Sequence, residues 1–325
     1  MTLFADSLRR FLASGIAAQS ADPSLHVGSW LARPNYYVTE VSSPDRFILT
    51  LPDIADAHAL FAAAANKTLS ACFETVISIS EVDRSPRSLA WSLVKLYYAA
   101  YFGAHGVMRS CGMGCMNLDA VDTTRVLDGA HAYGVAGSIN KINSGLYSVR
   151  LDAAAATLTF AAVSSKGSHE ALWLSFLPFL DYLTAQAETL LPVEPQRKVF
   201  VEKIAGIKSI LCLEGANGGN WLSRFRNLVQ YRQGYGAWHP YSIDRRFPGS
   251  LLTKTGALFM QDPASFSLKV DLSKDTKKIE TFVEGTSFLA AVARTVVVDM
   301  GERSIDKQAL IKTGALALLR KAKLS

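Results

Sequence analysis

The segment 89–108 constrains the fold of this chain more than any other, because apolar residues occupy most sides of the helix that it predicts. Ser85 and Pro86 offer a helix start, since serine caps first-turn N–H groups and proline lacks the N–H that would be unpaired there. Gly112 offers a left-handed stop directly after Cys111. The pattern predicts a central helix that is packed on all sides.

The rest of the chain predicts more helices and two small β-hairpins. Apolar residues repeat at helical spacing over 3–18, 54–79, 168–191, 198–213, 221–232, 275–300 and 305–324. Strand-like alternation with turn residues predicts hairpins within 26–51 and 147–160. The segment 117–143 gives mixed signals, and the chain after Tyr241 reads as a long irregular stretch. The predicted class is mainly α, a multi-helix bundle with one or two small β-hairpin insertions.

Composition limits the class of protein further. Hydrophobic residues are 49% of the chain and the mean hydropathy is +0.16, so we expect a large core and apolar surface covered by a second subunit. The net charge of +6 permits a polyanionic partner without requiring one. Lys95 and His105 lie in the most apolar stretch, which favours a buried helix over a membrane span.

Cysteine usage and the start of the chain point to the cytoplasm. The four cysteines, Cys72, Cys111, Cys115 and Cys212, lack a second Cys/His pair at zinc spacing, which favours small buried thiols in a reducing compartment. The first residues do not form a basic leader followed by an apolar segment. We expect a cytoplasmic protein that uses no metal and no cofactor.

The stretch Arg224–Tyr241 is the strongest candidate for a functional site. It concentrates arginines, aromatic residues, an amide and a histidine. In the sequence 224–246, Asp244 is the one acidic residue. An ordinary solvated helix face mixes both signs of charge, so the bias favours docking of an anionic or aromatic group. Guanidinium groups match phosphate oxygens and aromatic faces stack on bases, which indicates an RNA or nucleotide site.

Helical spacing predicts how this stretch is arranged. Asn227 and Tyr231 share one face, as do Arg226 and Gln230. The helix can therefore bury an apolar back and present arginine, amide and tyrosine groups to a cleft. The side chains that we expect to contact nucleic acid are Arg224, Arg232, Tyr235, Trp238, Arg245 and Arg246.

The tyrosine-rich segment 96–105, followed later by a helix that carries Arg226-Asn227, resembles the HEPN superfamily over roughly residues 87–241. These are all-α domains, commonly dimeric, that occur in toxin–antitoxin and anti-phage defence systems. Active members are metal-independent ribonucleases in which both subunits contribute an arginine, a polar residue and a histidine to one cleft. The resemblance implies a homodimeric RNA-processing or RNA-binding protein, in first place a metal-independent endoribonuclease that acts as a toxin or defence effector. It also implies an antitoxin or defence-operon partner.

By the same resemblance, Arg226 would hold the scissile phosphate and Asn227 would orient it, while Tyr231 or His239 would handle the proton. It also implies an N-terminal accessory region at 1–82, a HEPN-like helical core at 83–250 and a C-terminal helical region at 251–325, or one compact domain that includes all three.

The chain departs from the family pattern where the histidine should stand. Tyr231, Arg232 or Gln233 occupies that place, and His239 lies too far along. A tyrosine hydroxyl, with an ordinary pKa of about 10, is a poor general base at neutral pH. Three alternatives stay open: Tyr231 donates the proton, His239 or His105 supplies the proton transfer, or the site binds RNA without cutting it as an inactive scaffold module.

Structural roles are open for the same residues. The arginine and amide can join helices at a dimer interface, the aromatic residues can pack in the core, and the histidines can be hydrogen-bonded structural residues. The segment 215–219 reads as a connection, because it lacks the ending of a phosphate-binding loop. An enzyme of unrelated chemistry within 234–246 is a further class, although no nucleophile–base pair or carboxylate pair supports it.

Overall fold

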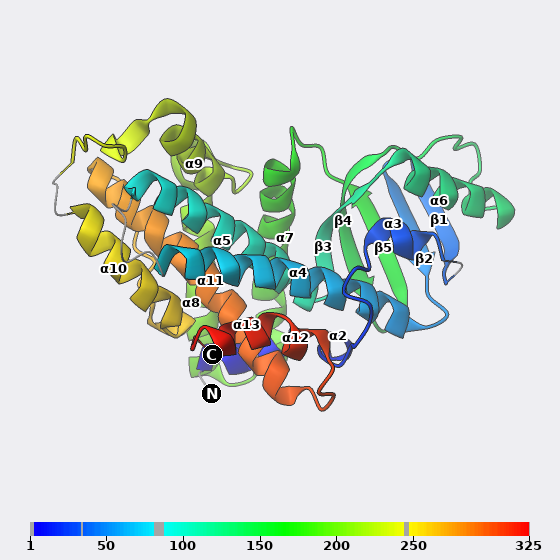
Figure 1. Ribbon diagram of the computed structural model, residues 1–325. Coiled ribbons are helices and arrows are strands. Elements are labelled where there is room, and N and C mark those ends of the chain that lie inside the picture. The colour runs from blue at the N-terminus through cyan, green and yellow to red at the C-terminus, as the bar shows by residue number, and fades with distance from the viewer. Residues whose placement is uncertain (1–2, 34, 81–87, 244–246, 325) are drawn as a thin grey trace.

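The computed structural model describes residues 3–33, 35–80, 88–243 and 247–324. A body of long helices lies beside one antiparallel sheet, to which smaller helices are attached (Figure 1). The helices are α1 (Leu3–Arg9), α2 (Ser14–Ala17), α3 (Val27–Leu31), α4 (Ile54–Ser80), α5 (Leu89–Ser110), α6 (Ala120–Ala132), α7 (Ser168–Leu190), α8 (Glu194–Leu211), α9 (Trp221–Arg232), α10 (Phe247–Met260), α11 (Asp275–Arg303), α12 (Leu310–Thr313) and α13 (Ala315–Lys321). The strands are β1 (Tyr37–Ser43), β2 (Arg46–Thr50), β3 (Met113–Leu118), β4 (Gly145–Asp152) and β5 (Thr157–Ala162). The mainly α class with a small β insertion is confirmed.

Helix α5 is central, as its apolar pattern predicts. It packs against α4, α7, α9 and α11, and most of its residues are buried. The cap is Ser88, whose side chain accepts a hydrogen bond from the N–H of Trp91 at 3.4 Å. The predicted start at Ser85 and Pro86 lies outside the described residues. Gly112 follows the helix with a φ of 72°, the left-handed conformation that a glycine stop needs.

Both predicted hairpins form, and together with β3 they make one sheet with the strand order β1-β2-β5-β4-β3. The hairpins join through β2 and β5, where Phe47 lies opposite Phe160 and the two rings stack at 4.7 Å. Helices α3 and α6 cover this face of the sheet (Figure 1). The apolar alternation of each hairpin therefore buries one face of a shared sheet.

The helical periodicity of the sequence did not predict α3, α6 or α10. In α6 the cap compensates for a weak apolar stripe, since the Asp119 carboxylate accepts hydrogen bonds from the N–H groups of Val121 and Asp122 at 2.8 and 2.9 Å. The predicted first helix was too long, because it divides into α1 and α2. The predicted last helix divides in the same way into α12 and α13.

Helix α11 supplies much of the core. It has 29 residues and is apolar enough by length and composition to cross a membrane, but 78% of its most apolar window is buried inside the protein. Burial on several sides accounts for that composition. Among the described residues, one connected cluster of buried apolar side chains includes Phe61, Leu96 and Phe288, one from each of the three predicted regions. The predicted boundaries between these regions stay a prediction.

Candidate functional site

Helix α9 docks through an aromatic side. Trp221, Phe225 and Val229 are buried, and the Phe225 ring is stacked between Tyr235 at 4.4 Å and Phe282 at 4.2 Å. Asn220 stands at the N-cap of α9, but its side chain forms no capping hydrogen bond. Phe225 fixes the rotation of α9 about its own axis, and this rotation decides which polar residues face solvent.

That rotation turns Arg226 inward instead of toward an open cleft. The residue is 5% exposed. Its guanidinium carbon lies 4.9 Å from the ring centre of Tyr97 and 5.6 Å from that of Tyr98, both on α5. Nη1 donates to the Gln230 Oε1 at 3.2 Å, and the buried Nε has no hydrogen-bond partner in the described part of the chain. Aromatic faces and one amide hold this cation inside the protein, where a carboxylate would be the usual partner.

The outer face of α9 carries Arg224, Asn227 and Tyr231, which are spaced at helical intervals and are all exposed. Tyr231 is 68% exposed, the largest fraction among the exposed aromatic side chains described. Arg232 is exposed beside it. Within the described ranges neither Arg224 nor Arg232 belongs to an ion pair. This part of the predicted site is therefore exposed to solvent, and Arg224 and Arg232 have no acidic partner among the described residues.

Two predicted nucleic-acid contacts, Tyr235 and Trp238, make packing contacts and stay partly exposed. Tyr235 stacks on Phe225, and burial raises the pKa of its hydroxyl to about 12. The Trp238 indole donates from Nε1 to the Val229 carbonyl at 2.8 Å and meets Trp91 edge to face. The packing alternative is confirmed for these two aromatic residues. Of the other predicted contacts, Arg245 and Arg246 lie outside the described residues.

His239 is exposed, and its ring meets Tyr241 at 5.8 Å. The contacts described for Arg226 are with the α5 tyrosines, Gln230 and Tyr231. Within the described part of one chain, no contact therefore joins His239 to the Arg226 guanidinium. The two groups would have to act together to cleave RNA.

A polar stripe along α5 leads away from Arg226 and was missed by the sequence reasoning. Tyr97, Tyr101, His105 and Arg109 recur every fourth residue, which places them on one side of the helix. The Tyr97 hydroxyl is 2.9 Å from His169 Nδ1, and the His169 ring lies 4.6 Å from that of Tyr101. The Tyr101 ring lies 4.8 Å from that of His105. The regular spacing was visible in the sequence, but the apolar residues around it suggested only a core helix.

His105 is buried, as the core-histidine alternative predicts, but its Nδ1 lacks a hydrogen-bond partner among the described residues. Burial lowers its pKa well below 6.5, and the nearby Arg109 adds to the effect. Burial and then Arg226 lower the pKa of His169 in the same direction. Both rings are thus held neutral in the folded protein.

We expect the free energy of unfolding to decrease as the pH falls from 6.5 toward about 5. His105 takes up a proton near its ordinary pKa of 6.5 in the unfolded chain, whereas burial lowers its pKa in the folded protein. Below pH 6.5 the unfolded chain therefore binds the extra proton, and each further pH unit lowers the free energy of unfolding by up to about 1.4 kcal/mol. His105→Gln should reduce this slope and leave the part due to His169. Urea denaturation at several pH values measures how the free energy of unfolding changes with pH. Equal slopes for wild type and His105→Gln would contradict a contribution from His105.

The cysteines have mixed burial. All four are free thiols, of which Cys72 and Cys115 are buried and Cys111 and Cys212 are partly exposed. Burial raises the pKa of Cys111 to about 12. In the described part of the chain, no group of three or more His, Cys, Asp or Glu residues is placed to hold a metal ion.

No protein-family model matches this chain, and neither does a curated protein or a solved structure. The resemblance to the HEPN superfamily therefore depends on the residues of α5 and α9 alone.

Proposed function

We propose that this chain is a HEPN-like, cytoplasmic RNA-binding protein that binds single-stranded RNA on the outer face of α9 and leaves it uncut. The observation that supports it most is Tyr231, 68% exposed beside arginines that belong to no ion pair in the described ranges. An unpaired base stacks on an aromatic ring without regard to sequence, and the guanidinium groups follow the phosphates.

Two observations favour binding over cleavage. Arg226, which the resemblance makes the phosphate-holding residue, is 5% exposed and engaged by the Tyr97 and Tyr98 rings. The polar residue at the place of the family histidine is Tyr231, and His239 is not among the described contacts of Arg226. Breaking a phosphodiester needs proton transfer as well as charge stabilisation. The exposed face offers arginines for the charge, but the described contacts bring no histidine to Arg226.

Tyr231→Ala is expected to weaken binding of a short single-stranded RNA by about five- to 150-fold, because loss of one base–aromatic stack costs about 1–3 kcal/mol. Arg224→Ala should weaken binding to any sequence and flatten its salt dependence. Fluorescence anisotropy with a labelled RNA measures both. The matched control is Tyr133→Ala, which removes a tyrosine that is 51% exposed at the end of α6.

Incubating wild-type protein with several RNAs, including tRNA, and no divalent metal separates binding from cleavage. Intact RNA on a denaturing gel is the expected result. Cleavage that disappears in a folded Arg226→Ala protein would show that the chain is an endoribonuclease and that Arg226 leaves its tyrosine contacts. Equal RNA affinity for wild type and Tyr231→Ala would place any RNA site elsewhere.

A further inference from the structure

A cavity of ≈ 360 Å³ lies where α4 and α5 meet β3 and the segment before α3. These elements come together at the junction between the helical body and the sheet (Figure 1). The cavity is lined mainly by apolar side chains, including Leu60, Met116 and Leu146. Its charged lining residues are Lys67 and Arg109, and no carboxylate is among the described residues that line it. It is separate from the α9 face and has the character of a small-molecule site.

Arg109 is the last residue of the stripe along α5 and forms no ion pair with any described residue. Its Nη1 and Nη2 donate to the carbonyls of Ala64 and Cys115 at the long distances of 3.4 and 3.3 Å. Its buried Nε has no hydrogen-bond partner in the described part of the chain. Burial lowers the pKa of the guanidinium to about 10, so it remains a cation at neutral pH. A cation placed in an apolar lining without a carboxylate is a strong attractor for an anion.

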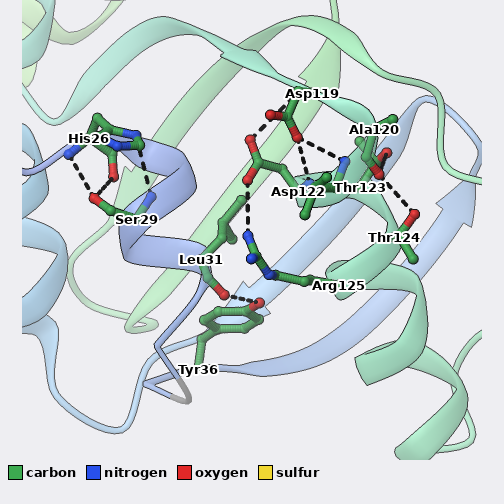
Figure 2. A network of polar contacts seen from close by, with 11 residues as sticks. His26, Ser29, Leu31, Tyr36, Asp119, Ala120, Asp122, Thr123, Thr124 and Arg125 are labelled. Carbon is green, nitrogen blue, oxygen red and sulfur yellow. Dashed lines mark hydrogen bonds and ion pairs between the residues drawn. The ribbon is translucent and has the colours of Figure 1, made fainter.

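Asp119 and Asp122, at the start of α6, are engaged in contacts of their own. Asp119 caps α6, and Asp122 accepts from the Asp119 N–H at 3.2 Å and pairs with Arg125 at 3.6 Å (Figure 2). His26 is occupied too, since its Nδ1 caps α3 through the Ser29 N–H at 3.3 Å (Figure 2). These contacts lie within the starts of α3 and α6, and no ion pair among the described residues joins an acid to Lys67 or Arg109.

The lining also sets the charge and the shape of the ligand. His105 is held neutral beside Arg109, so the guanidinium and the Lys67 ammonium are the positive groups. The apolar part of the lining favours a ligand with an apolar body. A single carboxylate beside Arg109 and Lys67 costs much less to desolvate than a dianion. We propose that this cavity binds a small monocarboxylate with an apolar body. The carboxylate meets Arg109 and Lys67, and the apolar body lies along Leu60, Met116 and Leu146.

Isothermal titration calorimetry with octanoate, octanamide and inorganic phosphate tests the proposal. Octanoate and its amide have nearly the same shape and differ in charge. Octanoate should bind with one-to-one stoichiometry, octanamide at least about tenfold more weakly because the charge-assisted hydrogen bonds are lost, and phosphate not at all. Equal affinities for octanoate and octanamide, or stronger binding of phosphate, would overturn the proposal.

Three variants locate the site. Lys67 is exposed, so Lys67→Met should fold and weaken octanoate severalfold without changing octanamide. Ala64→Phe fills the cavity and should abolish binding of both compounds. Lys269→Met removes an exposed lysine that does not line the cavity and should change neither. Octanoate binding that survives Ala64→Phe would exclude this cavity.

The proposal does not depend on RNA binding. Tyr231→Ala should keep its full octanoate affinity, because Tyr231 is not in the cavity lining. Failure of the RNA test and failure of the carboxylate test are therefore separate results.

Discussion

Asp299→Ala is expected to lower the free energy of unfolding by about 3–5 kcal/mol, because it leaves two guanidinium groups without their shared carboxylate. Asp299 lies on α11 and is 3% exposed. Its Oδ1 accepts from Arg9 Nε on α1, and its Oδ2 accepts from Arg303 Nε, both at 2.8 Å. The substitution removes the polar link between the first helix and the central body.

Urea denaturation measures this loss, and Asp128→Ala is the matched control. Asp128 is an exposed carboxylate on α6, so its removal should change the free energy of unfolding by less than about 0.5 kcal/mol. A loss below about 1 kcal/mol for Asp299→Ala would mean that solvent compensates both arginines in the folded protein.

Phe225→Ala is expected to cost about 3–5 kcal/mol, the range for removing a buried aromatic ring without collapse of the site. The ring is 1% exposed and is stacked on both faces, by Tyr235 at 4.4 Å and Phe282 at 4.2 Å. Its loss should loosen α9 from α11 and destabilise the turn that follows α9.

Tyr231→Ala, six positions further along the same helix, is the control for this loss. Tyr231 is 68% exposed, so its truncation should change stability by less than about 0.5 kcal/mol. The two variants separate the two faces of α9. Phe225→Ala should lose stability, whereas Tyr231→Ala should lose RNA affinity. Comparable destabilisation by both variants would show that the outer face is packed against another subunit.

The sequence by itself determined the elements whose residues repeat on one face. The apolar pattern of 89–108 predicted α5, and two alternating stretches predicted both hairpins. The helical spacing of Asn227 and Tyr231 placed them correctly on one exposed face of α9. These predictions succeed because periodicity is a local property, fixed by the rise and turn of the backbone.

Local pattern was insufficient for α6, where polar residues dilute the apolar stripe and a capping box completes the helix. It also missed α10, which packs against α4 and α11 from a distant part of the chain. It was also insufficient for the sheet, because nothing within either hairpin specifies that β2 will pair with β5. The cavity has the same origin, since Lys67 lies on α4 and Arg109 on α5, and only the packing of these two helices brings them to one cavity.

Arg226 shows most clearly the difference between what the sequence determines and what the tertiary structure decides. Spacing assigned it to a helix face but not to a partner, and its charge suggested solvent. The structure places the Tyr97 and Tyr98 rings of α5 against its guanidinium, so cation–π contacts and the Gln230 amide hold the charge in the interior. The sequence determined which residues share a face. Only the tertiary structure decided what each face meets, because the environment of a side chain is set by elements distant in the chain.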